Sequence, residues 1–598
     1  MTASATPSSS SSSSSSPAAV ALTPVVEQEI AKFQNTLDLL AQGAIDADKV
    51  FKPYRLVHGI YGQRQQGENQ MVRIKLKYGV CTPAQMRVLA DLSEELTNGI
   101  SHITTRQAIQ YHFVQLSDVP GMMRRLEEVG MTTREACGNA VRAVVGSPNA
   151  GTRIDEPFAI EPYAEAVYQH FLRGPFSSNL PRKFKIGFGA SDQDILAQVN
   201  LQDIGAMGVI KDGRLGFRIL AAGGLGSSPQ APIQLYECLP RDRLIPVCEA
   251  ILRLFHKHGD RTNRAKARLK FVLRKHGDDG FRKLFEECLA EVDKDGITGK
   301  ILPDTLPPAK PSVIPLDIGS AEERSWRKWN VKPHRENGLA VVSVCVPRGD
   351  LPATQLRALA DITEQYSQGD ARTTNDQNVV LRRVKLADLS AVFTALTALG
   401  YARKAHTLVD VVSCPGASTC QLGITLSKNL GRELEQGLAA LNDERVLQAH
   451  INISGCPNSC GQHHIGTIGL HGAASKIGDK LVPHYVLMVG GADEGNRIQF
   501  ASMVARIPAR KVATTILALA GWYVAERGAT ESFVHYLRRI NGDGLEKDAA
   551  KLVKAALKER LLPIFSYKEG ELTAADLHDL GSEKLFSLDE IGAGECMS

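Results

Sequence analysis

The sequence predicts an α+β fold that is internally duplicated, because one stretch of the chain recurs further along it. Residues 83–99 align without gaps on residues 353–369, a constant offset of 270 positions (353 minus 83). Helical spacing alone could reproduce the apolar matches, but not the polar identities, which indicate a true repeat. The identical pairs are Gln85/Gln355, Arg87/Arg357, Leu89/Leu359, Ala90/Ala360, Asp91/Asp361, Glu94/Glu364, Gly99/Gly369, Thr104/Thr374 and Gln107/Gln377.

Both copies predict the same succession of elements. A β-like run precedes a helix that ends at glycine, and a second strand and a second helix follow. In the first copy the run, second strand and second helix are expected at 71–78, 109–114 and 119–129. In the second copy they are expected at 339–346, 379–384 and 389–399. A proline-rich connector, residues 303–315, separates the two halves.

The regions after each copy resemble one another more faintly. Residues 217–226 and 485–491 each predict a strand that runs into a glycine pair. Such a pair is either a plain turn or a place where backbone approaches a flat or anionic ligand. Gly223 and Gly224 are therefore candidate ligand contacts.

Bulk composition is that of a globular protein of several domains. The 598 residues exceed one core, and no apolar run is long enough to cross a bilayer. A net charge of +5 is too small to argue for nucleic acid. Seven cysteines without disulfide-framework spacing, and no secretory signal pattern, predict a cytoplasmic protein. The Ser-rich residues 1–20 predict a disordered tail.

Four further cysteines form two clusters, S-C-P-G-A-S-T-C and S-G-C-P-N-S-C-G. Four thiolates are the ligand count of a four-iron four-sulfur cluster, and small residues between them allow tight turns. Buried free thiols and structural zinc are the alternatives, although the five residues within the first pair exceed the usual zinc spacing. The four are Cys414, Cys420, Cys456 and Cys460.

The corresponding part of the first half carries cations instead of thiols. Lys183 and Lys185 are two apart in L-P-R-K-F-K, so on a strand they point to one face. Each cation alone is most simply a solvated surface charge, but the set indicates an anion site. Its members are Arg73, Arg106, Arg142, Lys183 and Lys185.

With these motifs the chain resembles the sirohaem-dependent nitrite and sulfite reductase family, most closely the bacterial sulfite reductase haemoprotein. The resemblance covers roughly residues 50–560 and rests on both cysteine pairs and four basic motifs. Those motifs are V-R-I-K, T-T-R-Q-A-I-Q-Y-H, G-N-A-V-R and L-P-R-K-F-K. One departure is Thr467, which stands where the family usually has an acidic residue.

The resemblance implies two ferredoxin-like half-domains related by a pseudo-two-fold axis, plus two mixed α/β sirohaem/iron–sulfur domains. The half-domains are expected at 50–145 and 325–405, and the larger domains at 146–302 and 406–560. Residues 303–324 are then a linker and residues 561–598 a C-terminal tail.

It also implies sirohaem beside a [4Fe-4S] cluster. Cys414, Cys420 and Cys456 would bind the cluster alone, and Cys460 would also bridge to the haem iron. The neighbouring His463 and His464 are expected to be structural or outer contacts, since adjacent side chains of a strand diverge. The remaining expected cofactor contacts are Arg106, Gln110, His112, Gly223, Gly224, Arg261 and Arg268. Arg261 and Arg268 belong to a basic run, residues 259–270, which could instead be a solvated helix face.

The implied reaction is six-electron reduction of sulfite to sulfide in sulfur assimilation, with reduction of nitrite to ammonia as the alternative. Nitrite reductases of the family tend to read P-R-K-W-N here, so the second lysine, Lys185, favours the sulfite dianion. Arg73 and Arg142 are expected to bind substrate, and Lys183 and Lys185 to supply protons. No flavin or nicotinamide domain is evident, so electrons would come from ferredoxin or a flavoprotein subunit.

Two other classes of protein stay open at this point. A non-catalytic zinc or cluster scaffold would explain the cysteines but not the opposed cations. A phosphate-binding transferase would explain the cations and the glycine pairs but would leave the cysteines without a role. An absorption spectrum with a haem Soret band would distinguish the reductase from both.

Overall fold

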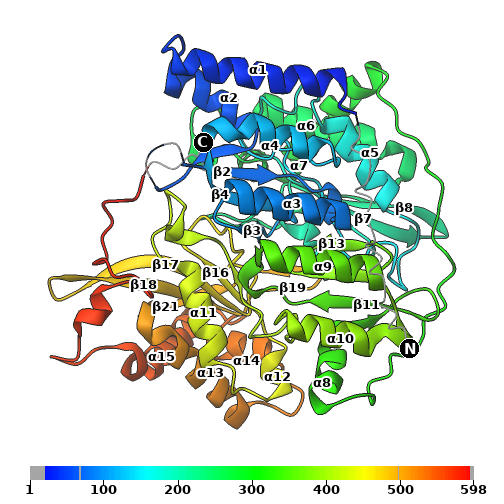
Figure 1. Ribbon diagram of the computed structural model, residues 1–598. Coiled ribbons are helices and arrows are strands. Elements are labelled where there is room, and N and C mark those ends of the chain that lie inside the picture. Colours follow the sequence, from blue (N-terminus) through cyan, green and yellow to red (C-terminus); the bar gives the residue numbers. More distant parts are fainter. Residues whose placement is uncertain (1–20, 66, 68, 496, 593–598) are drawn as a thin grey trace, which may run out of the picture.

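The computed structural model describes residues 21–592 except 66, 68 and 496 (Figure 1). The expected disordered tail therefore lies outside the described residues. Two small sheets carry helices on one face, as the repeat predicts, and two larger mixed sheets complete the fold. Among the described residues, no helix is both long and apolar enough to cross a bilayer.

The first small sheet has the strand order β1-β2-β4-β3-β12, and the second has the order β10-β11-β14-β13. The helices expected from the repeat are present in both copies, at α3 (Pro83–Leu96) with α4 (Val119–Glu127) and at α9 (Ala353–Tyr366) with α10 (Leu389–Ala398). The strands are β1 (Ile60–Gly62), β2 (Asn69–Ile74), β3 (Ile100–Ile103), β4 (Ile109–Gln115), β10 (Val331–Pro333), β11 (Leu339–Val344), β12 (Asp350–Pro352), β13 (Ala371–Thr373) and β14 (Val379–Lys385).

Helices α3 and α9 lie side by side where the two copies meet (Figure 1). Arg87 on α3 bonds Asp361 and Glu364 on α9, at 2.8 and 2.5 Å. The reciprocal bonds run from Arg357 on α9 to Asp91 and Glu94 on α3, at the same two distances. The polar identities of the repeat thus pair across the pseudo-two-fold axis, although as exposed ion pairs they add little stability.

The repeated glutamines close the same interface from inside. The Gln107 amide donates to the carbonyls of Gly146 and Thr373, and its oxygen accepts from the Gly146 N–H. The Gln377 amide donates to the carbonyl of Ile103, which is the repeat partner of Thr373, and accepts from Ser413 N–H. Each glutamine therefore joins its own copy to the other and to the following large domain.

Replacing Gln107 by Ala is expected to lower the free energy of unfolding by about 2–3 kcal/mol, because it leaves buried backbone groups unpaired. The midpoint of thermal unfolding measures this loss. The exposed Gln115, which bonds Asn69 at the sheet edge, is the matched control and should cost under about 0.5 kcal/mol. Equal midpoints of thermal unfolding for the Gln107 and Gln115 variants would contradict the role given to Gln107.

The two large domains share one sheet topology. The first has the order β5-β6-β7-β8-β9 and the second β15-β16-β17-β18-β21; in each, two parallel pairings are followed by two antiparallel ones. The strands are β5 (Val145–Gly146), β6 (Ile186–Gly189), β7 (Ile204–Lys211), β8 (Arg214–Ala221), β9 (Ile233–Pro240), β15 (Val412–Ser413), β16 (Ile451–Ser454), β17 (Ile468–Ile477), β18 (Lys480–Val489) and β21 (Ser502–Pro508). A two-stranded sheet joins β19 (Ala492–Asp493) to β20 (Ile498–Gln499). The two large domains thus share one topology, and only the second carries the two cysteine pairs.

Helices cover these sheets and the ends of the chain. Those of the first half are α1 (Pro24–Ala41), α2 (Lys52–Val57), α5 (Glu161–Phe171), α6 (Leu244–His258) and α7 (Leu269–Lys294). Those of the second half are α8 (Ala321–Asn330), α11 (Ser427–Gly437), α12 (Glu444–Leu447), α13 (Val512–Glu526), α14 (Phe533–Ile540) and α15 (Lys547–Phe565).

Two expected boundaries need correction. Helix α8 begins at Ala321, inside the expected linker 303–324, because Ser320 caps it by accepting from the Glu323 N–H. Helix α15 continues past residue 560 to Phe565, inside the expected tail. Buried Leu561 and Phe565 anchor that last turn to the core.

Candidate cofactor and anion site

A cavity of about 330 Å³ lies where the two halves meet, and it gathers the predicted thiols and cations. Its wall includes side chains from both small sheets and both large domains. The predicted residues that line it are Arg73, Arg106, Gln110, His112, Arg142, Lys183, Lys185, Arg268, Cys414, Cys420, Cys456 and Cys460. The structure therefore brings the cations of the first half and the cysteines of the second half into one cavity.

The cysteines lie on two loops that touch backbone to backbone. Cys414 directly follows β15, and Cys456 follows β16 after one intervening residue, Gly455. A Cβ on Gly455 would lie 2.6 Å from the Gly416 Cα, so only glycine permits this approach. The Gly455 N–H donates to the Cys414 Sγ at 3.2 Å, which ties one cysteine loop to the other.

The thiols are electrostatically coupled. Burial, together with the neighbouring Cys460 and Cys414, raises the pKa of Cys456 to about 12. A bound metal cluster removes this penalty, because a coordinated thiol is deprotonated. Among the described residues, no three His, Cys, Asp or Glu side chains are placed to hold a single metal ion. Four thiols around one cavity fit the four-ligand set of an iron–sulfur cluster.

Arg142 is held so firmly that it can offer little to a ligand. Its guanidinium makes four hydrogen bonds, two to the Gly138 carbonyl, one to the Ala136 carbonyl and one to the Tyr61 hydroxyl. Guanidinium has five N–H donors, so one remains. Arg142, which was expected to bind substrate, therefore offers a fixed positive charge and a single free donor. Arg73, which donates to Gln110, lies in the same wall.

Lys183 and Lys185 both line the cavity, although they precede β6 and do not lie within it. Between them Phe184 forms a parallel bridge to Val141, which keeps the segment extended and turns both lysines to one side. The Lys185 N–H donates to the Asp203 carboxylate at 2.9 Å. Burial, with the cations Arg106 and Arg268, holds the pKa of Lys185 well below its usual value.

Several buried donors around the cavity lack a protein acceptor. These are Arg106 Nε, Arg268 Nε and His112 Nδ1, although each side chain is held by other bonds. Arg106 donates to Gln202 and to the Ala143 carbonyl, and Arg268 donates to Asp203. Burial lowers the pKa of Arg106 to about 9. An anionic cofactor with several carboxylates, as sirohaem is, fits a wall with such donors.

Three of the expected cofactor contacts lie elsewhere. Gly223 and Gly224 do not line the cavity; the next residues, Leu225 and Gly226, do. A Cβ on Gly223 would meet the Asn200 carbonyl at 2.6 Å, so this glycine serves the close packing of its own chain. Arg261 is exposed and donates to the carbonyls of Asn179 and His256. The basic run is not one helix face, since Arg261 precedes a short 3-10 turn and Arg268 caps α7.

His463 and His464 were expected on a strand with diverging side chains, and this is wrong. They lie in a turn, and their ring centroids are only 4.2 Å apart. His464 donates from Nε2 to the Gly226 carbonyl, which joins the cysteine domain to the glycine loop of the first half. Thr467, the departure from the family pattern, is buried, and its hydroxyl accepts from the His450 N–H.

The cavity wall contains further ionisable residues: Lys75, His102 and Arg182 were not among the predicted site residues, whereas Lys270 belongs to the basic run described above. Burial lowers the pKa of Lys75 to about 8 and that of Arg182 to about 10. Lys270 donates to the carbonyls of Leu225 and Ser228, and its pKa is lowered to about 7 by burial. Lys75 is two residues after Arg73, so the alternation used for Lys183 and Lys185 indicates it too. His102 also lines the cavity, but no motif or spacing in the sequence indicates it.

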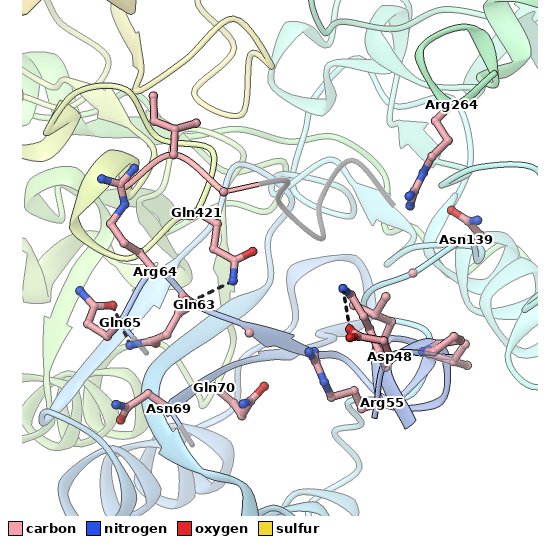
Figure 2. Close-up of a pocket in the computed structure, with 18 of the residues that line it drawn as sticks. Asp48, Arg55, Gln63, Arg64, Gln65, Asn69, Gln70, Asn139, Arg264 and Gln421 are labelled. Carbon is pink, nitrogen blue, oxygen red and sulfur yellow. Dashed lines mark hydrogen bonds and ion pairs between the residues drawn. The ribbon is translucent and has the colours of Figure 1, made fainter. Parts of the chain in front are cut away.

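A larger hollow of about 1590 Å³ adjoins this cavity. The two share Gly62, Gln63, Arg264 and Gln421 as lining residues. In Figure 2, Arg264 and Asn139 lie on one side of the hollow and Arg64 and Gln421 on the other. Arg64 also pairs with Glu590 at 3.4 Å, so the C-terminal segment forms part of this outer wall.

Fold and site together define an enzyme built for a redox centre and a small anion. Residues 137–292 match the family described as nitrite and sulphite reductase 4Fe-4S domain, and residues 61–129 and 332–399 match its ferredoxin-like half domain. The first match covers the large domain without the cysteine pairs, which lie in its structural copy.

Individual relatives agree with this class. A ferredoxin sulfite reductase of Mycolicibacterium paratuberculosis is 30% identical over 70% of this chain and 76% of its own. A chloroplastic ferredoxin–nitrite reductase of Arabidopsis thaliana is 29% identical over 82% of this chain and 81% of its own. The structure of the Mycobacterium tuberculosis NirA protein superposes with a TM-score of 0.72 at 26% identity, covering 88% of this chain and 97% of that one. The chain belongs to the nitrite and sulfite reductase family, whose members reduce these anions at sirohaem and a 4Fe-4S cluster.

Proposed function

We propose that this enzyme reduces sulfite to sulfide, taking six electrons one at a time from an external donor. The observation that carries the proposal is the cavity in which four thiols face a larger set of cations, among them Arg73, Arg142, Lys183 and Lys185. A scaffold protein has no need of that opposition, and a phosphate-binding transferase has no need of the thiols.

Cys414, Cys420, Cys456 and Cys460 would hold the cluster, with Cys460 as the thiolate shared with the haem iron. When bound, sirohaem and the cluster would pass the electrons of the external donor to the anion one at a time. Arg106, His112 and Arg268, whose buried donors lack protein acceptors, would receive the haem carboxylates. In this proposal the residues that line the cavity fall into a thiol group, a cofactor-binding group and a substrate-binding group.

In the substrate-binding group, Arg73 and Arg142 would compensate the charge of the anion, as a dianion cannot enter a buried site alone. Lys183 and Lys185 would hold the protons that leave with oxygen as water. The lowered pKa of Lys185 suits this task, because such a lysine releases its proton more readily than an ordinary one.

Nitrite is the second candidate, because a nitrite reductase is as similar to this chain as the sulfite reductases are. With one artificial electron donor, we expect the ratio kcat/KM to be higher for sulfite than for nitrite by about tenfold or more, since Lys185 adds a cation for the dianion. A higher kcat/KM for nitrite would contradict the substrate proposal while leaving the family unchanged.

Ferredoxin is the donor we favour over a flavoprotein subunit, because both groups of relatives are named as ferredoxin enzymes. Reduced ferredoxin should then support turnover at low ionic strength and lose efficiency as salt screens the encounter. Turnover only with a flavoprotein and NADPH would reverse this choice.

A cytoplasmic location stays a proposal as well, and fractionation of the cell would test it.

A further inference from the structure

Behind the cavity wall lies a group of three polar side chains that none of the steps above uses. His102 lines the cavity and is 3% exposed, whereas Asp350 and Lys428 behind it are 27% and 17% exposed. His102 Nδ1 lies 2.9 Å from Asp350 Oδ1 and 3.1 Å from Lys428 Nζ. The group therefore connects the solvent side of the wall to the cavity side through one imidazole ring.

We propose that Lys428, Asp350 and His102 form a proton relay that refills the cavity from solvent. This inference rests on the proposed function, because only a proton-consuming reaction needs such a supply. It adds a route to the proposed lysine donors, which must regain a proton after each step.

The two contacts of His102 Nδ1 suit opposite states of the ring. When Nδ1 is unprotonated it accepts from the Lys428 ammonium, and when it carries hydrogen it donates to the Asp350 carboxylate. On the cavity side, His102 Nε2 is 3.4 Å from the Gln377 amide nitrogen, too far for a strong bond. Nε2 can therefore release its proton to the cavity while Nδ1 takes one from Lys428, which regains a proton from solvent. Before the next transfer the proton on Nδ1 must return to the Nε2 position, by tautomeric exchange or by rotation of the ring.

Burial, more than the surrounding charges, keeps His102 neutral at rest. It faces Lys428 on α11, Asp350 on β12, Arg73 on β2 and the neighbouring His112 on β4. Burial, with Lys428 and Arg73, lowers the pKa of His102 to about 4, and Asp350 opposes that shift. A neutral imidazole has one nitrogen free to accept, as a relay requires.

The duplication provides an internal comparison. His102 pairs with Asp350 across β3 and β12, and the repeat partners of these two residues, Arg372 and Val80, form the equivalent bridge. Arg372 is bound to Glu161 at 2.7 Å and cannot give up a proton, and Val80 has no charge. The relay group exists only in the copy that faces the cavity, so the fold itself does not require it.

The test uses the loaded enzyme with three variants, His102→Gln, Asp350→Asn and Lys428→Met. The first should lower turnover about tenfold or more and raise the solvent deuterium isotope effect, with sulfite affinity unchanged. The other two should lower turnover less. His406→Gln is the matched control. His406 Nδ1 lies 3.4 Å from Asp376 Oδ2, and this pair does not line the cavity. It should keep wild-type turnover and isotope effect.

A second readout does not depend on activity. In protein labelled with ¹⁵N-histidine, the signal lost in His102→Gln identifies this ring, and its titration can be followed by NMR. Asp350→Asn should lower the pKa of His102, and Lys428→Met should raise it. Wild-type turnover and isotope effect in His102→Gln, or a His102 signal that neither variant moves, would overturn the relay. Failure of the wild type to reduce either anion would instead contradict the proposed function, and the NMR result would still decide whether the three groups are coupled.

Discussion

Replacing Cys460 by Ser is expected to abolish anion reduction and to remove both chromophores from the purified protein. A serine oxygen binds iron less well than a thiolate does, and Cys460 is the ligand that we assign to both the cluster and the haem. Absorption spectra and the iron content per chain measure the loss directly. No other single change should have a larger effect, because the two cofactors depend on this one sulfur.

Cys238 offers a matched control for this substitution. Its thiol lies on β9, partly exposed, and donates weakly to the Arg214 carbonyl at 3.7 Å. Cys238→Ser should keep the spectrum, the iron content and the turnover of the wild type. If Cys460→Ser kept the haem and cluster absorption, Cys460 would not be a ligand and the assignment of the cysteine pairs would be wrong.

Replacing Lys185 by Asn is expected to lower kcat/KM for sulfite by about 10²-fold or more, through the loss of a proton donor and of a cation. The same change should reduce the preference for sulfite over nitrite, since a neutral amide stands at this position in nitrite-reducing relatives. Lys211→Gln is the control, because Lys211 is exposed and pairs with Glu237 far from the cavity wall. Equal loss for both anions would leave Lys185 as a proton donor without a part in selectivity.

The pH dependence of sulfite binding separates these two parts. Without an anion, burial and neighbouring cations keep the pKa of Lys185 well below its usual value. A bound dianion favours the ammonium form and raises this pKa, so binding takes up a proton above the pKa of the empty site. Affinity should therefore fall as pH rises in the wild type, and fall less steeply in Lys185→Asn. The titration of sulfite itself is common to both proteins and cancels in the comparison.

The sequence alone established the duplication, the fold class and the elements of both half-domains. These follow from local pattern: helices α3 and α9 begin at the first residue of the repeated stretch and end three residues before its glycine, and strands β4 and β14 run one residue past their predicted ends. The two cysteine pairs were also visible, because their ligands are close together in the chain. What depends on neighbours within about ten residues could be predicted.

Only the tertiary structure decided which side chains are available for chemistry. Four of the five N–H donors of Arg142 bond to nearby backbone carbonyls and to Tyr61. No sequence motif indicates these bonds. His102, Asp350 and Lys428 are 78 to 326 positions apart and meet only because β12 crosses to the first sheet and α11 begins beside it. Burial and pairing arise from contacts distant in sequence, so a pattern names the candidate residues but does not determine their charge, donors or partners.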